Sequence, residues 1–412
     1  MTEVRLPGSK SVTARALFLA AAAEGRSVIT RPLSAFDTRA FLGALVALGY
    51  SVSVADERWE ITGSPAGPPA GAGAVWCHDA ATAARFLPVL CAAGCGTYVI
   101  DSSDQMRARP MAPLVGALRD LGVSVQAAVG DHLPLRIAAN GIKGGDIVLD
   151  AGVSSQFLTA LCLLGPLTSQ GLRVSVTDLV SAPYIDLTIA MMSAFGADVR
   201  RAGNEFEIRP QTYQATEYAV EPDASTASYF LAAAAVTGQI VTIPGLGSRS
   251  TQGDLRFGTE VLAAMGCRVE LEEDLIALAG PRQLIGGEFD MRDISDTMPT
   301  LAAIAPFADS PVTITGIANV RVKECDRLAA MESNLRACGI GVSSGPDWIT
   351  IEPGRPHGAE VACHADHRIA MACSVLGLRT PGITLDNPLC VSKTCPEFHS
   401  LLGGLRDAWE IP

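Results

Sequence analysis

The sequence predicts a mixed α/β protein built from several copies of one small module and divided between two domains. The module is a short β-rich run, a polar or glycine-containing turn and an alanine- and leucine-rich helix. Each helix ends in a similar phrase, in which apolar residues meet a glycine that suits the left-handed conformation just after a helix. Five such endings occur, at Leu45–Tyr50, Leu118–Val123, Met192–Ala197, Leu262–Cys267 and Leu335–Ile340.

A short alternating run follows each ending, as in Ser51–Val54 and Ala197–Arg200, and such runs favour β-strands. Spacings of roughly seventy residues separate the endings, which is too long for a solenoid repeat. The pattern is typical of βαβαββ-type units shared between two domains. Because many helices end in glycine, a single ending would be weak evidence, and the recurrence carries the prediction.

The length of the chain also favours two domains, because 412 residues exceed one ordinary hydrophobic core. Apolar residues make up 48% of the sequence and the mean hydropathy is +0.28, which indicates well-filled cores rather than disorder. We place a domain boundary near Tyr218–Asp223, where a β-like run meets Glu221 and Pro222. The Pro-, Ala- and Gly-rich stretch Gly63–Gly73 is interpreted as a loop inside the first half.

The net charge of −12 makes nucleic acid and anionic membranes poor partners. Glu3 lies near the start, and no apolar signal core precedes Pro7. Elsewhere the apolar runs are short or are broken by glycine, proline or charge, so none resembles a membrane span. We therefore expect a cytoplasmic protein that acts on small molecules, without a nucleic-acid or membrane partner.

The cysteines are interpreted as reduced and mostly buried thiols, without a metal site. Their number is odd, no Cys-x-x-Cys spacing occurs, and only six histidines accompany them. The eleven cysteines are Cys77, Cys91, Cys95, Cys162, Cys267, Cys325, Cys338, Cys363, Cys373, Cys390 and Cys395.

The stretch Leu6–Arg15 is the first candidate for a binding site. Pro7 and Gly8 mark a turn, Ser9 or Ser11 can cap a helix, and the alanine-rich run to Ala23 can form that helix. A helix start attracts anions through its unpaired N–H groups and its dipole, and here Lys10 and Arg15 add two cations. The stretch indicates a site for a phosphate or a carboxylate; the alternative is a capped surface helix with solvated cations.

Two further segments of the first half carry hydroxyl and amide groups before a helix. Ser154, Ser155 and Gln156 lie between a β-like run and an apolar helix, and they indicate a second anion or polyol site. A plain serine cap is the alternative reading of this segment. Downstream, Ser181 and Tyr184 add two more donors.

The second half concentrates ionisable groups in three places. Asp296 precedes a helix, where a lone aspartate is usually a cap. Asn319–Arg327 packs acids and bases together before a further helix, and Asp366–Arg368 puts a histidine beside an arginine, a combination that suits proton transfer next to an anion. Lys393 lies near the C-terminal end. Solvated charge runs and a structural histidine are the alternatives.

Taken together, the motifs PGSKS, DVRxxLxALxALG, RPxxPL, SSQFLTAL, SxPYIDLT, EPDASxASYFLAAA, QGDxRF, NxRVKExDRL, DHRxAMA and KTxPEF cover nearly the whole chain, the second of them as Asp37-Thr38-Arg39 to Gly49. In order and spacing they resemble the motifs of the EPSP synthase (3-phosphoshikimate 1-carboxyvinyltransferase) family, within the enolpyruvyltransferase superfamily. The sister family that acts on UDP-N-acetylglucosamine is similar in architecture, but the SSQF, PYID and RVKE motifs resemble the shikimate branch.

The resemblance implies an inside-out α/β barrel of two similar domains, residues 1–8 with 222–412 and residues 9–221, and an active site in the cleft between them. It implies transfer of the enolpyruvyl group from phosphoenolpyruvate to the 5-hydroxyl of shikimate 3-phosphate, with release of phosphate by addition and elimination. It further implies a monomer that needs no metal or organic cofactor.

The site residues are likewise carried over from the resemblance. Proton transfer is assigned to Lys10, Asp296, Glu324 and His367, the last as a support for Glu324. The expected ligands of shikimate 3-phosphate are Lys10, Ser11, Arg15, Ser154, Ser155, Ser181, Tyr184, Asp296, Asn319 and Lys323. Those of phosphoenolpyruvate are Lys10, Asp79, Ala81, Arg109, Gln156, Arg327, Arg368 and Lys393.

One segment departs from the family pattern. Cys77–Arg85 stands where the family usually has Gly-Asn-Ala-Gly-Thr-Ala-x-Arg, so that His78 and Asp79 replace Gly-Asn and Ala81 replaces a glycine. The methyl of Ala81 is expected to crowd the herbicide glyphosate more than the smaller substrate, which predicts tolerance. Asp79 suits a helix cap, but its charge would face an anionic substrate unless His78 or a nearby cation neutralises it.

This departure keeps other functions open. The first hypothesis is a carboxyvinyltransferase with altered affinity for phosphoenolpyruvate. A second hypothesis is a diverged paralogue in a specialised pathway that performs elimination on shikimate 3-phosphate, or on a related cyclitol phosphate, without phosphoenolpyruvate. A third is a catalytically weak binding protein, which would have little need for the full set of ionisable residues.

Overall fold

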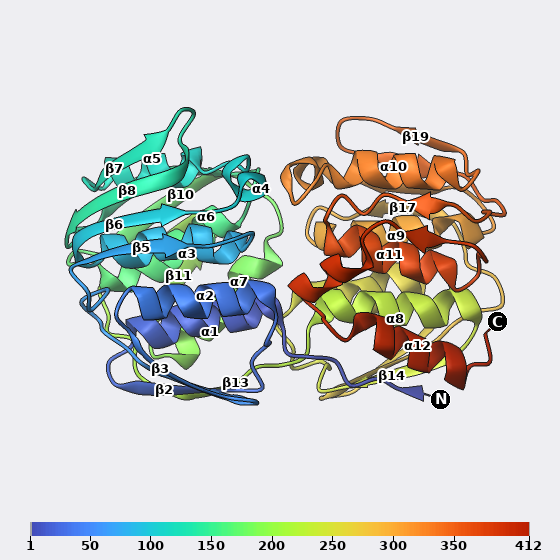
Figure 1. Ribbon diagram of the computed structural model, residues 1–412, viewed down its shortest axis with the longest axis horizontal. Helices are drawn as coiled ribbons and strands as arrows, with labels where there is room; N and C mark the ends of the chain where they lie inside the picture. The colour runs from blue at the N-terminus through green and yellow to red at the C-terminus, as the bar shows by residue number, and fades with distance from the viewer. Residues whose placement is uncertain (1, 412) are drawn as a thin grey trace. The chain divides into compact units, whose positions relative to one another are not determined.

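The computed structural model describes residues 2–411, and these form two compact units. The N-terminal unit is Gly8–Val220, and the C-terminal unit joins the residues up to Pro7 to the chain from Glu221 onward. Figure 1 colours the N-terminal unit from blue to green and most of the C-terminal unit from yellow-green to red. The chain thus passes twice from one unit to the other, and these bounds differ by one residue from the division expected on the resemblance.

Every sheet of the N-terminal unit has four strands in the same arrangement. A parallel pair is followed by an antiparallel strand and its hairpin partner, so that in β5-β6-β8-β7 only the pair β5/β6 is parallel. The other two sheets have the orders β13-β2-β4-β3 and β11-β12-β10-β9. The strands are β2 (Arg26–Thr30), β3 (Ser51–Ala55), β4 (Arg58–Thr62), β5 (Ala72–Trp76), β6 (Cys95–Asp101), β7 (Ser124–Ala128), β8 (His132–Asn140), β9 (Gly145–Ala151), β10 (Leu172–Leu179), β11 (Val199–Ala202), β12 (Glu205–Ile208) and β13 (Glu217–Ala219).

The C-terminal unit repeats this arrangement twice and shortens it once. Its four-stranded sheets have the orders β1-β14-β16-β15 and β17-β18-β20-β19, and its third sheet is only the parallel pair β21-β22. The strands are β1 (Thr2–Glu3), β14 (Ile240–Pro244), β15 (Arg268–Leu271), β16 (Leu275–Ala279), β17 (Gly287–Asp290), β18 (Val312–Thr315), β19 (Val342–Ser344), β20 (Ile349–Ile351), β21 (Glu360–Val361) and β22 (Thr384–Leu385). The predicted mixed α/β fold of repeated units in two domains is confirmed.

In each unit, three helices lie in the interior and the sheets surround them (Figure 1). All described side chains from Val12 to the end of α1 are buried, and so is every residue of α3. A helix that is apolar on all sides belongs in an interior, which explains why these alanine-rich segments take the central position. The buried helices are α1 (Lys10–Ala22), α3 (Ala81–Ala92) and α6 (Gln156–Leu164) in the N-terminal unit, and α8 (Ala224–Thr237), α9 (Met298–Ile304) and α11 (His367–Gly377) in the C-terminal unit.

The outer helices bury only one side. In α2, for example, Phe41 and Leu45 are buried whereas Phe36 and Val46 are exposed. These helices are α2 (Phe36–Ala47), α5 (Ala112–Asp120) and α7 (Pro183–Ala194) in the N-terminal unit, and α10 (Arg327–Ala337) and α12 (Phe398–Ala408) in the C-terminal unit. Among the helices described, none combines the length and the apolar character that a membrane span requires.

The five glycines that the sequence places at helix ends all have a left-handed backbone, with φ between 79° and 93°, and a strand follows each of them. This prediction is confirmed. Two details differ from it: β11 starts at Val199, two residues later than expected, and the helix before Gly266 is a π-helix, Phe257–Leu262, rather than an α-helix. Apolar spacing does not distinguish these two helix types. The glycines are Gly49, Gly122, Gly196, Gly266 and Gly339.

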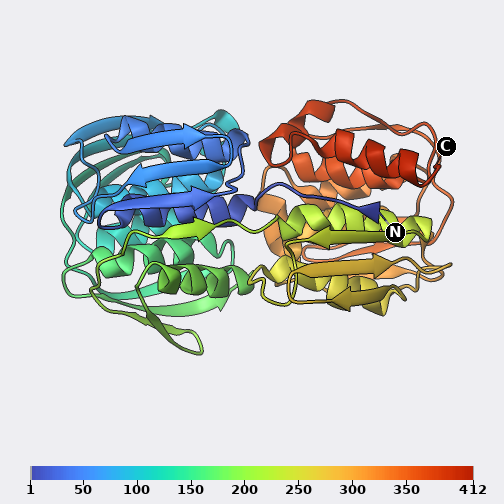
Figure 2. The ribbon, with the colours of Figure 1, turned by 90° about the horizontal axis from the view of Figure 1, so that it is seen from below.

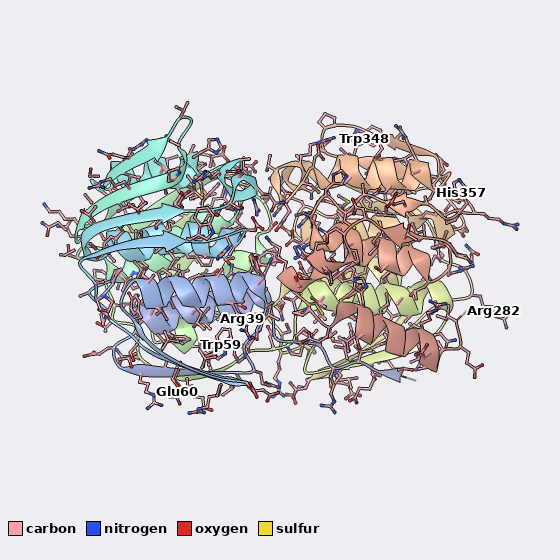
Figure 3. All side chains as sticks on the ribbon, in the orientation of Figure 1. Arg39, Trp59, Glu60, Arg282, Trp348 and His357 are labelled. Carbon is pink, nitrogen blue, oxygen red and sulfur yellow. The ribbon has the colours of Figure 1, made fainter. Side chains whose placement is uncertain are left out.

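Alternation along the strands sorts side chains between core and surface. On β4, Trp59 is buried in the core of the N-terminal unit, whereas the neighbouring Glu60 forms ion pairs with Arg26 and Arg58. Figure 3 labels Trp59 and Glu60. Within the C-terminal unit, β1 runs parallel to β14, with Thr2 opposite Val241 (Figure 2). One sheet of this unit therefore has as its edge a strand from the start of the chain.

Candidate active site

The start of α1 holds Lys10 close to a carboxylate. Ser9 is the N-cap of this helix, because its hydroxyl accepts a hydrogen bond from the Val12 amide at 3.4 Å. Of the two serines that the sequence offered as caps, Ser9 is therefore the one used, and Ser11 lies within the helix. The Lys10 ammonium lies 3.8 Å from the carboxylate of Asp37 on α2, and both side chains are largely shielded from solvent.

Arg15 joins three helices of the N-terminal unit. Its guanidinium donates to the Thr188 hydroxyl at 2.9 Å, to the Ser11 carbonyl at 3.0 Å and to the Tyr184 carbonyl at 3.1 Å. A weaker bond reaches Thr159 on α6, and the side chain is buried. Burial lowers the pKa of Arg15 to about 10. Because each of its nitrogens already donates within the protein, Arg15 connects the segments that carry Ser11 and Tyr184.

Arg85 on α3 organises the start of α6. Its guanidinium donates to the Gln156 side-chain oxygen at 2.9 Å, to the Ser154 hydroxyl at 3.2 Å and to the Pro110 carbonyl at 3.2 Å, and it lies over the Phe157 ring. One guanidinium thus fixes both Gln156 and Ser154. It also holds Pro110, the residue that follows Arg109. Sequence reasoning retained Arg85 from the motif but assigned it no role, because the residues that it joins lie far apart in the chain.

Arg109 is buried and is followed by Pro110, whose carbonyl Arg85 binds. Its backbone is held by His132 on β8, whose Nδ1 lies 3.0 Å from the Arg109 carbonyl and 2.8 Å from that of Arg107. The turn that carries Arg109 is therefore attached to both α3 and β8.

Several helices of the N-terminal unit start without a side-chain cap bond from the N-cap residue, and α3, α6 and α7 are among them. The N-cap residues of α3, α6 and α7 are Ala80, Ser155 and Ala182, and none of them makes a side-chain hydrogen bond to the helix. The starts of these three helices carry predicted substrate ligands, and a helix start favours an anion through its dipole and its N–H groups. In α6 the first of these groups, the Gln156 amide, donates to the Ser154 hydroxyl at 3.3 Å. Two of the preceding residues, His78 and Ser181, have left-handed backbones with φ of 51° and 54°.

Asp79 is not the cap of α3, although its type suited that position; the cap position belongs to Ala80. The Asp79 carboxylate instead accepts a hydrogen bond from the Ser103 hydroxyl. Ser103 is itself the N-cap of the short helix α4 (Asp104–Arg107), where it accepts from the Met106 amide at 3.3 Å. Ala81 is the first residue of α3 and is 7% exposed.

In the C-terminal unit, Arg327 lies at the centre of three carboxylates. Its guanidinium donates to Glu324 at 2.6 Å, to Asp296 at 3.1 Å and to Asp366 at 2.7 and 3.3 Å, and its side chain is only 1% exposed. Burial acts to lower the pKa of Arg327, but the three carboxylates, Asp366 foremost, outweigh burial and raise it. The arginine thus stays charged and fixes the carboxylates in place.

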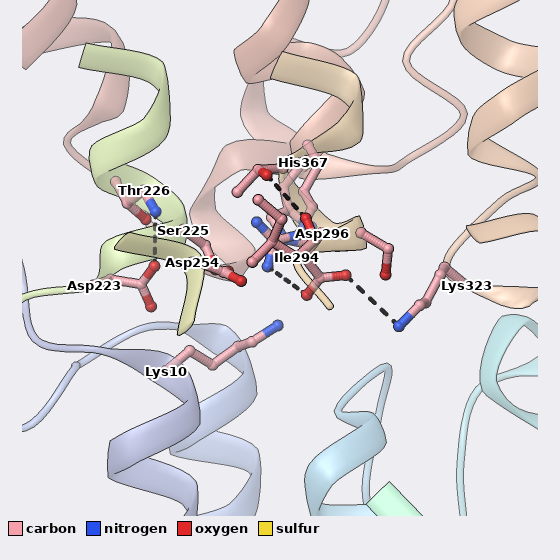
Figure 4. A network of polar contacts seen from close by, with 12 residues as sticks. Lys10, Asp223, Ser225, Thr226, Asp254, Ile294, Asp296, Lys323 and His367 are labelled. Atoms are coloured by element: carbon pink, nitrogen blue, oxygen red, sulfur yellow. Dashed lines mark hydrogen bonds and ion pairs between the residues drawn. The ribbon is translucent and has the colours of Figure 1, made fainter. Parts of the chain in front are cut away.

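Asp296 receives two further cations. Arg368 donates to its carboxylate at 2.8 Å, and the Lys323 ammonium lies 3.6 Å from it; Figure 4 shows this contact with Lys323. Together with Arg327, three basic residues therefore surround one carboxylate that is 19% exposed. This grouping concentrates basic side chains of the kind that bind carboxylates and phosphates.

Glu324 lies between two cations. The Arg327 guanidinium is 2.6 Å from one of its oxygens, and the Lys393 ammonium is 3.9 Å from the other. The side chains of Glu324 and Lys393 are 6% and 8% exposed, so water has little access to this pair. A carboxylate beside an ammonium group can exchange a proton with it or with a bound substrate.

Asp366 and His367 complete this group. Asp366 is the N-cap of α11 and accepts from the Arg368 amide at 2.9 Å, while His367 Nδ1 lies 3.6 Å from its carboxylate. The His367 side chain is fully buried, and Arg327 links Asp366 to Glu324. The role of His367 as a support for Glu324 stays a prediction. Asn319 donates to the Ser295 hydroxyl at 3.0 Å, directly before Asp296.

The predicted site residues of the C-terminal unit cluster around Arg327, and those of the N-terminal unit lie at or near helix starts. The N-terminal unit gathers Lys10, Ser11, Arg15, Asp79, Ala81, Arg109, Ser154, Ser155, Gln156, Ser181 and Tyr184 at or near helix starts, and the C-terminal unit gathers Asp296, Asn319, Lys323, Glu324, Arg327, His367, Arg368 and Lys393 around Arg327. Sequence reasoning gave no role to Arg85 or Asp366. For Asp366 the available signal was its position directly before a helix and a histidine. Among the described residues, no group of three or more His, Cys, Asp or Glu side chains could hold a metal ion.

Comparisons with known proteins agree with this architecture. Residues 1–402 match the sequence model of the family described as EPSP synthase (3-phosphoshikimate 1-carboxyvinyltransferase). A curated 3-phosphoshikimate 1-carboxyvinyltransferase from Nostoc punctiforme is 41% identical over 403 residues, which cover 96% of this chain and 94% of that protein. The protein of the same name from Edwardsiella ictaluri is 42% identical over 411 residues, with coverages of 98% and 96%.

Solved structures show the same fold. The EPSP synthase from Acinetobacter baumannii superimposes with a TM-score of 0.82 at 29% identity, covering 98% of this chain and 95% of that one. The enolpyruvyl transferase NikO from Streptomyces tendae gives a TM-score of 0.78 at 19% identity, with coverages of 98% and 94%, a likeness of fold alone. The fold is therefore that of the enolpyruvyl transferases. Within that class, the chain belongs to the EPSP synthase family.

Proposed function

We propose that the protein transfers the enolpyruvyl group of phosphoenolpyruvate to the 5-hydroxyl of shikimate 3-phosphate and releases phosphate. Family membership and relatives of that name at about 40% identity support this reaction. The observation that carries the proposal is the arrangement around Arg327, in which two carboxylates of low exposure, Glu324 and Asp296, are held among basic groups. Addition and elimination need carboxylates for proton transfer beside cations that bind anions.

In this proposal the C-terminal cluster supplies the acid and base groups. Protonation of the phosphoenolpyruvate methylene creates an oxocarbenium-like carbon, and the 5-hydroxyl attacks that carbon as it loses its proton. A methyl proton then leaves together with phosphate, which restores the double bond in the product. Glu324, Asp296 and Lys10 are the groups proposed for these transfers. Lys393, 3.9 Å from Glu324, is placed to favour its ionised form between turnovers.

The anionic groups of the substrates are assigned to residues of both units. Arg109, Gln156 and Ala81 in the N-terminal unit, and Arg327, Arg368 and Lys393 in the C-terminal unit, are proposed for phosphoenolpyruvate. The remaining serines, with Lys10, Arg15, Tyr184, Asn319 and Lys323, are proposed for shikimate 3-phosphate. Because these residues belong to different units, the proposal requires both units to act on one pair of substrates. The uncapped starts of α3, α6 and α7 support it, because such helix starts bind anions.

The alternative is an eliminase that uses shikimate 3-phosphate, or a related cyclitol phosphate, without phosphoenolpyruvate. The sequence His78-Asp79 favours it, because a carboxylate near the start of α3 would repel an anion there. The hydrogen bond from Ser103 weakens this argument, since it holds the Asp79 carboxylate toward α4.

Phosphate release distinguishes the two reactions. Purified protein is incubated with shikimate 3-phosphate, with phosphoenolpyruvate or with both, and inorganic phosphate is measured over time. The transferase releases phosphate only when both substrates are present, and mass spectrometry then detects the enolpyruvyl ether of shikimate 3-phosphate. Release from shikimate 3-phosphate alone would establish elimination, and no release in any mixture would favour a binding protein.

Further properties belong to the same proposal. We propose a cytoplasmic, monomeric enzyme without nucleic-acid or membrane partners, and tolerance to glyphosate through Ala81. The cysteines support the compartment, because no disulfide joins any two of them in the described chain and eight of the eleven are buried. The reaction as proposed needs no metal or organic cofactor.

A further inference from the structure

The turn that precedes α3 contains a strained residue. The Ala80 amide donates to the Cys77 carbonyl at 3.0 Å, which closes a four-residue turn with His78 in its second position. His78 has a φ of 51°, and positive φ in that position is the property of turns that normally use glycine or asparagine. The His78 carbonyl accepts from the Ser103 amide at 3.1 Å and from the Ser102 hydroxyl. The strain at this residue is therefore maintained by the structure around it.

The His78 ring has two aromatic neighbours. It meets the ring of Phe36, the first residue of α2, edge to face at 5.1 Å, and that of Trp76, the last residue of β5, at 6.2 Å. Such edge-to-face pairs are favourable, and here they join a helix start, a strand end and the turn. Phe36 and Trp76 are 45% and 47% exposed, and a cavity of about 430 Å³ lies beside the three rings, so no packed core fixes them.

The turn determines where the next charge lies. Directly after His78, the Asp79 carboxylate accepts from Ser103, the N-cap of α4, rather than from the amides of α3. The start of α3 consequently has no side-chain cap, and Ala81 is its first residue. Were the turn to relax to an ordinary negative φ at His78, the Asp79 carboxylate would leave Ser103. The start of α3, two residues further along the chain, would then offer its amide groups to this carboxylate.

We propose that His78 is a positioning residue, whose ring, held by Phe36 and Trp76, stabilises the turn that directs Asp79 to Ser103 and keeps the start of α3 open to the phosphoenolpyruvate anion. The inference rests on the proposed function, because the proposed function assigns phosphoenolpyruvate to the start of α3. The inference explains how a chain with His78 and Asp79 before α3 retains an anion site. His78 stabilises the turn, and the turn directs the Asp79 carboxylate to Ser103 and away from α3.

Four variants test the role of the ring. His78→Ala keeps the strain but loses both ring contacts, and it should raise the KM for phosphoenolpyruvate by about tenfold. His78→Phe retains an aromatic ring and should remain within about threefold of the parent, since the adjoining cavity accepts the larger ring. His78→Gly, which adopts positive φ freely but has no ring, should fall between them. Phe36→Ala should raise the same KM, and combined with His78→Ala it should add nothing.

The second substrate and a matched control separate positioning from a general loss of structure. The KM for shikimate 3-phosphate should stay within about twofold in all four variants, and thermal unfolding should show that each is folded. Glu410→Ala changes another left-handed residue, with φ of 52°, and should leave both KM values unchanged. Equal shifts of the two KM values, an effect of His78→Phe as large as that of His78→Ala, or additive effects at Phe36 and His78 would each overturn the inference.

Calorimetric titration of phosphoenolpyruvate, in the presence of shikimate 3-phosphate, distinguishes the inference from the function on which it rests. If the unmodified protein neither binds nor turns over phosphoenolpyruvate, the proposed function fails and the inference fails with it. If the unmodified protein binds it and His78→Ala binds it equally well, only the inference fails. Weaker binding by His78→Ala, restored in His78→Phe, supports both.

Discussion

The guanidinium of Arg327 donates two hydrogen bonds to the carboxylate of Asp366, at 2.7 and 3.3 Å, and neither side chain is more than 1% exposed. A buried ion pair of this kind adds little net stability, because both charges leave water. Removal of one partner is costly, since the other charge is left in the interior. The pair therefore matters chiefly for placing Arg327 against Glu324 and Asp296.

Replacing Asp366 with asparagine should lower the free energy of unfolding by about 3–5 kcal/mol, because Arg327 loses a buried counter-charge. Urea denaturation followed by circular dichroism measures this change. Asp326→Asn is the matched control: Asp326 is also an N-cap, of α10, but its side chain is 37% exposed. There the same substitution should cost no more than about 1 kcal/mol. Equal losses at the two positions would show that the burial of the pair is unimportant.

Replacing Glu324 with glutamine should reduce kcat by a factor of about 100 or more, because the amide keeps the shape of the carboxylate but cannot take up a proton. Phosphate release in the presence of both substrates measures kcat, and circular dichroism verifies the fold. Glu332→Gln makes the same change on α10, where Glu332 pairs with the exposed Arg336 at 2.7 Å, and should leave kcat unchanged. Near-normal turnover in Glu324→Gln would refute a role in proton transfer.

Replacing Ala81 with glycine should make the enzyme more sensitive to glyphosate, since it removes the methyl group at the start of α3 that is proposed to crowd the inhibitor. The concentration of glyphosate that halves the rate, at fixed phosphoenolpyruvate, is the measurement. Ala83→Gly, two residues further along the same buried helix, controls for the general cost of glycine in a helix, about 1 kcal/mol. An unchanged glyphosate response in Ala81→Gly would place the methyl group outside the inhibitor site.

The free energy of unfolding should fall as the pH rises above 9. Burial raises the pKa values of Cys77, Cys162 and Cys267 from 9.0 to about 12. Between these values the native state keeps thiol protons that the unfolded chain has lost, so each such thiol lowers the stability by about 1.4 kcal/mol per pH unit. The stability that protonated thiols contribute is complete below pH 9 and is lost toward pH 12.

Urea denaturation between pH 7 and 10 tests this expectation. Cys162→Ala removes one of these thiols. The free energy of unfolding of this variant should therefore decline less steeply above pH 9, by about 1.4 kcal/mol per pH unit. Leu163→Ala, a buried change next to it on α6, should lower the stability at every pH and leave the decline unchanged. Parallel curves for the protein and Cys162→Ala would show that this thiol does not contribute.

The repeated fold could be predicted because its signals are local. Gly49, Gly122, Gly196, Gly266 and Gly339 each follow an apolar helix end, and left-handed backbone is the property that glycine supplies there. The π-helix before Gly266 was missed, since the apolar spacing of a π-helix and of an α-helix is similar over six residues. The sequence does not decide between Ser9 and Ser11 as the cap, because a serine at either position can accept the same hydrogen bond.

The candidate site residues came from motifs, but their contacts could not be read from the chain. Arg85 joins Gln156 to Pro110, and Arg327 joins Asp296 to Asp366, over separations that only the tertiary fold closes. The sequence suggested a cap role for Asp79, which that residue type can fill. In the structure, the turn before α3 and Ser103 from another segment hold the Asp79 carboxylate away from the cap position. The local sequence around Asp79 gives no sign of this contact.

The pairing of β1 with β14 has a consequence for synthesis of the chain. Thr2 leaves the ribosome well before its partner Val241, which is made about 240 residues later. At 5–20 residues per second, the leading segment waits roughly 12 to 50 seconds before its sheet exists. During that interval it is an unpaired strand, and a fusion or chaperone that holds the nascent N-terminus would delay assembly of the half of the molecule that is translated last.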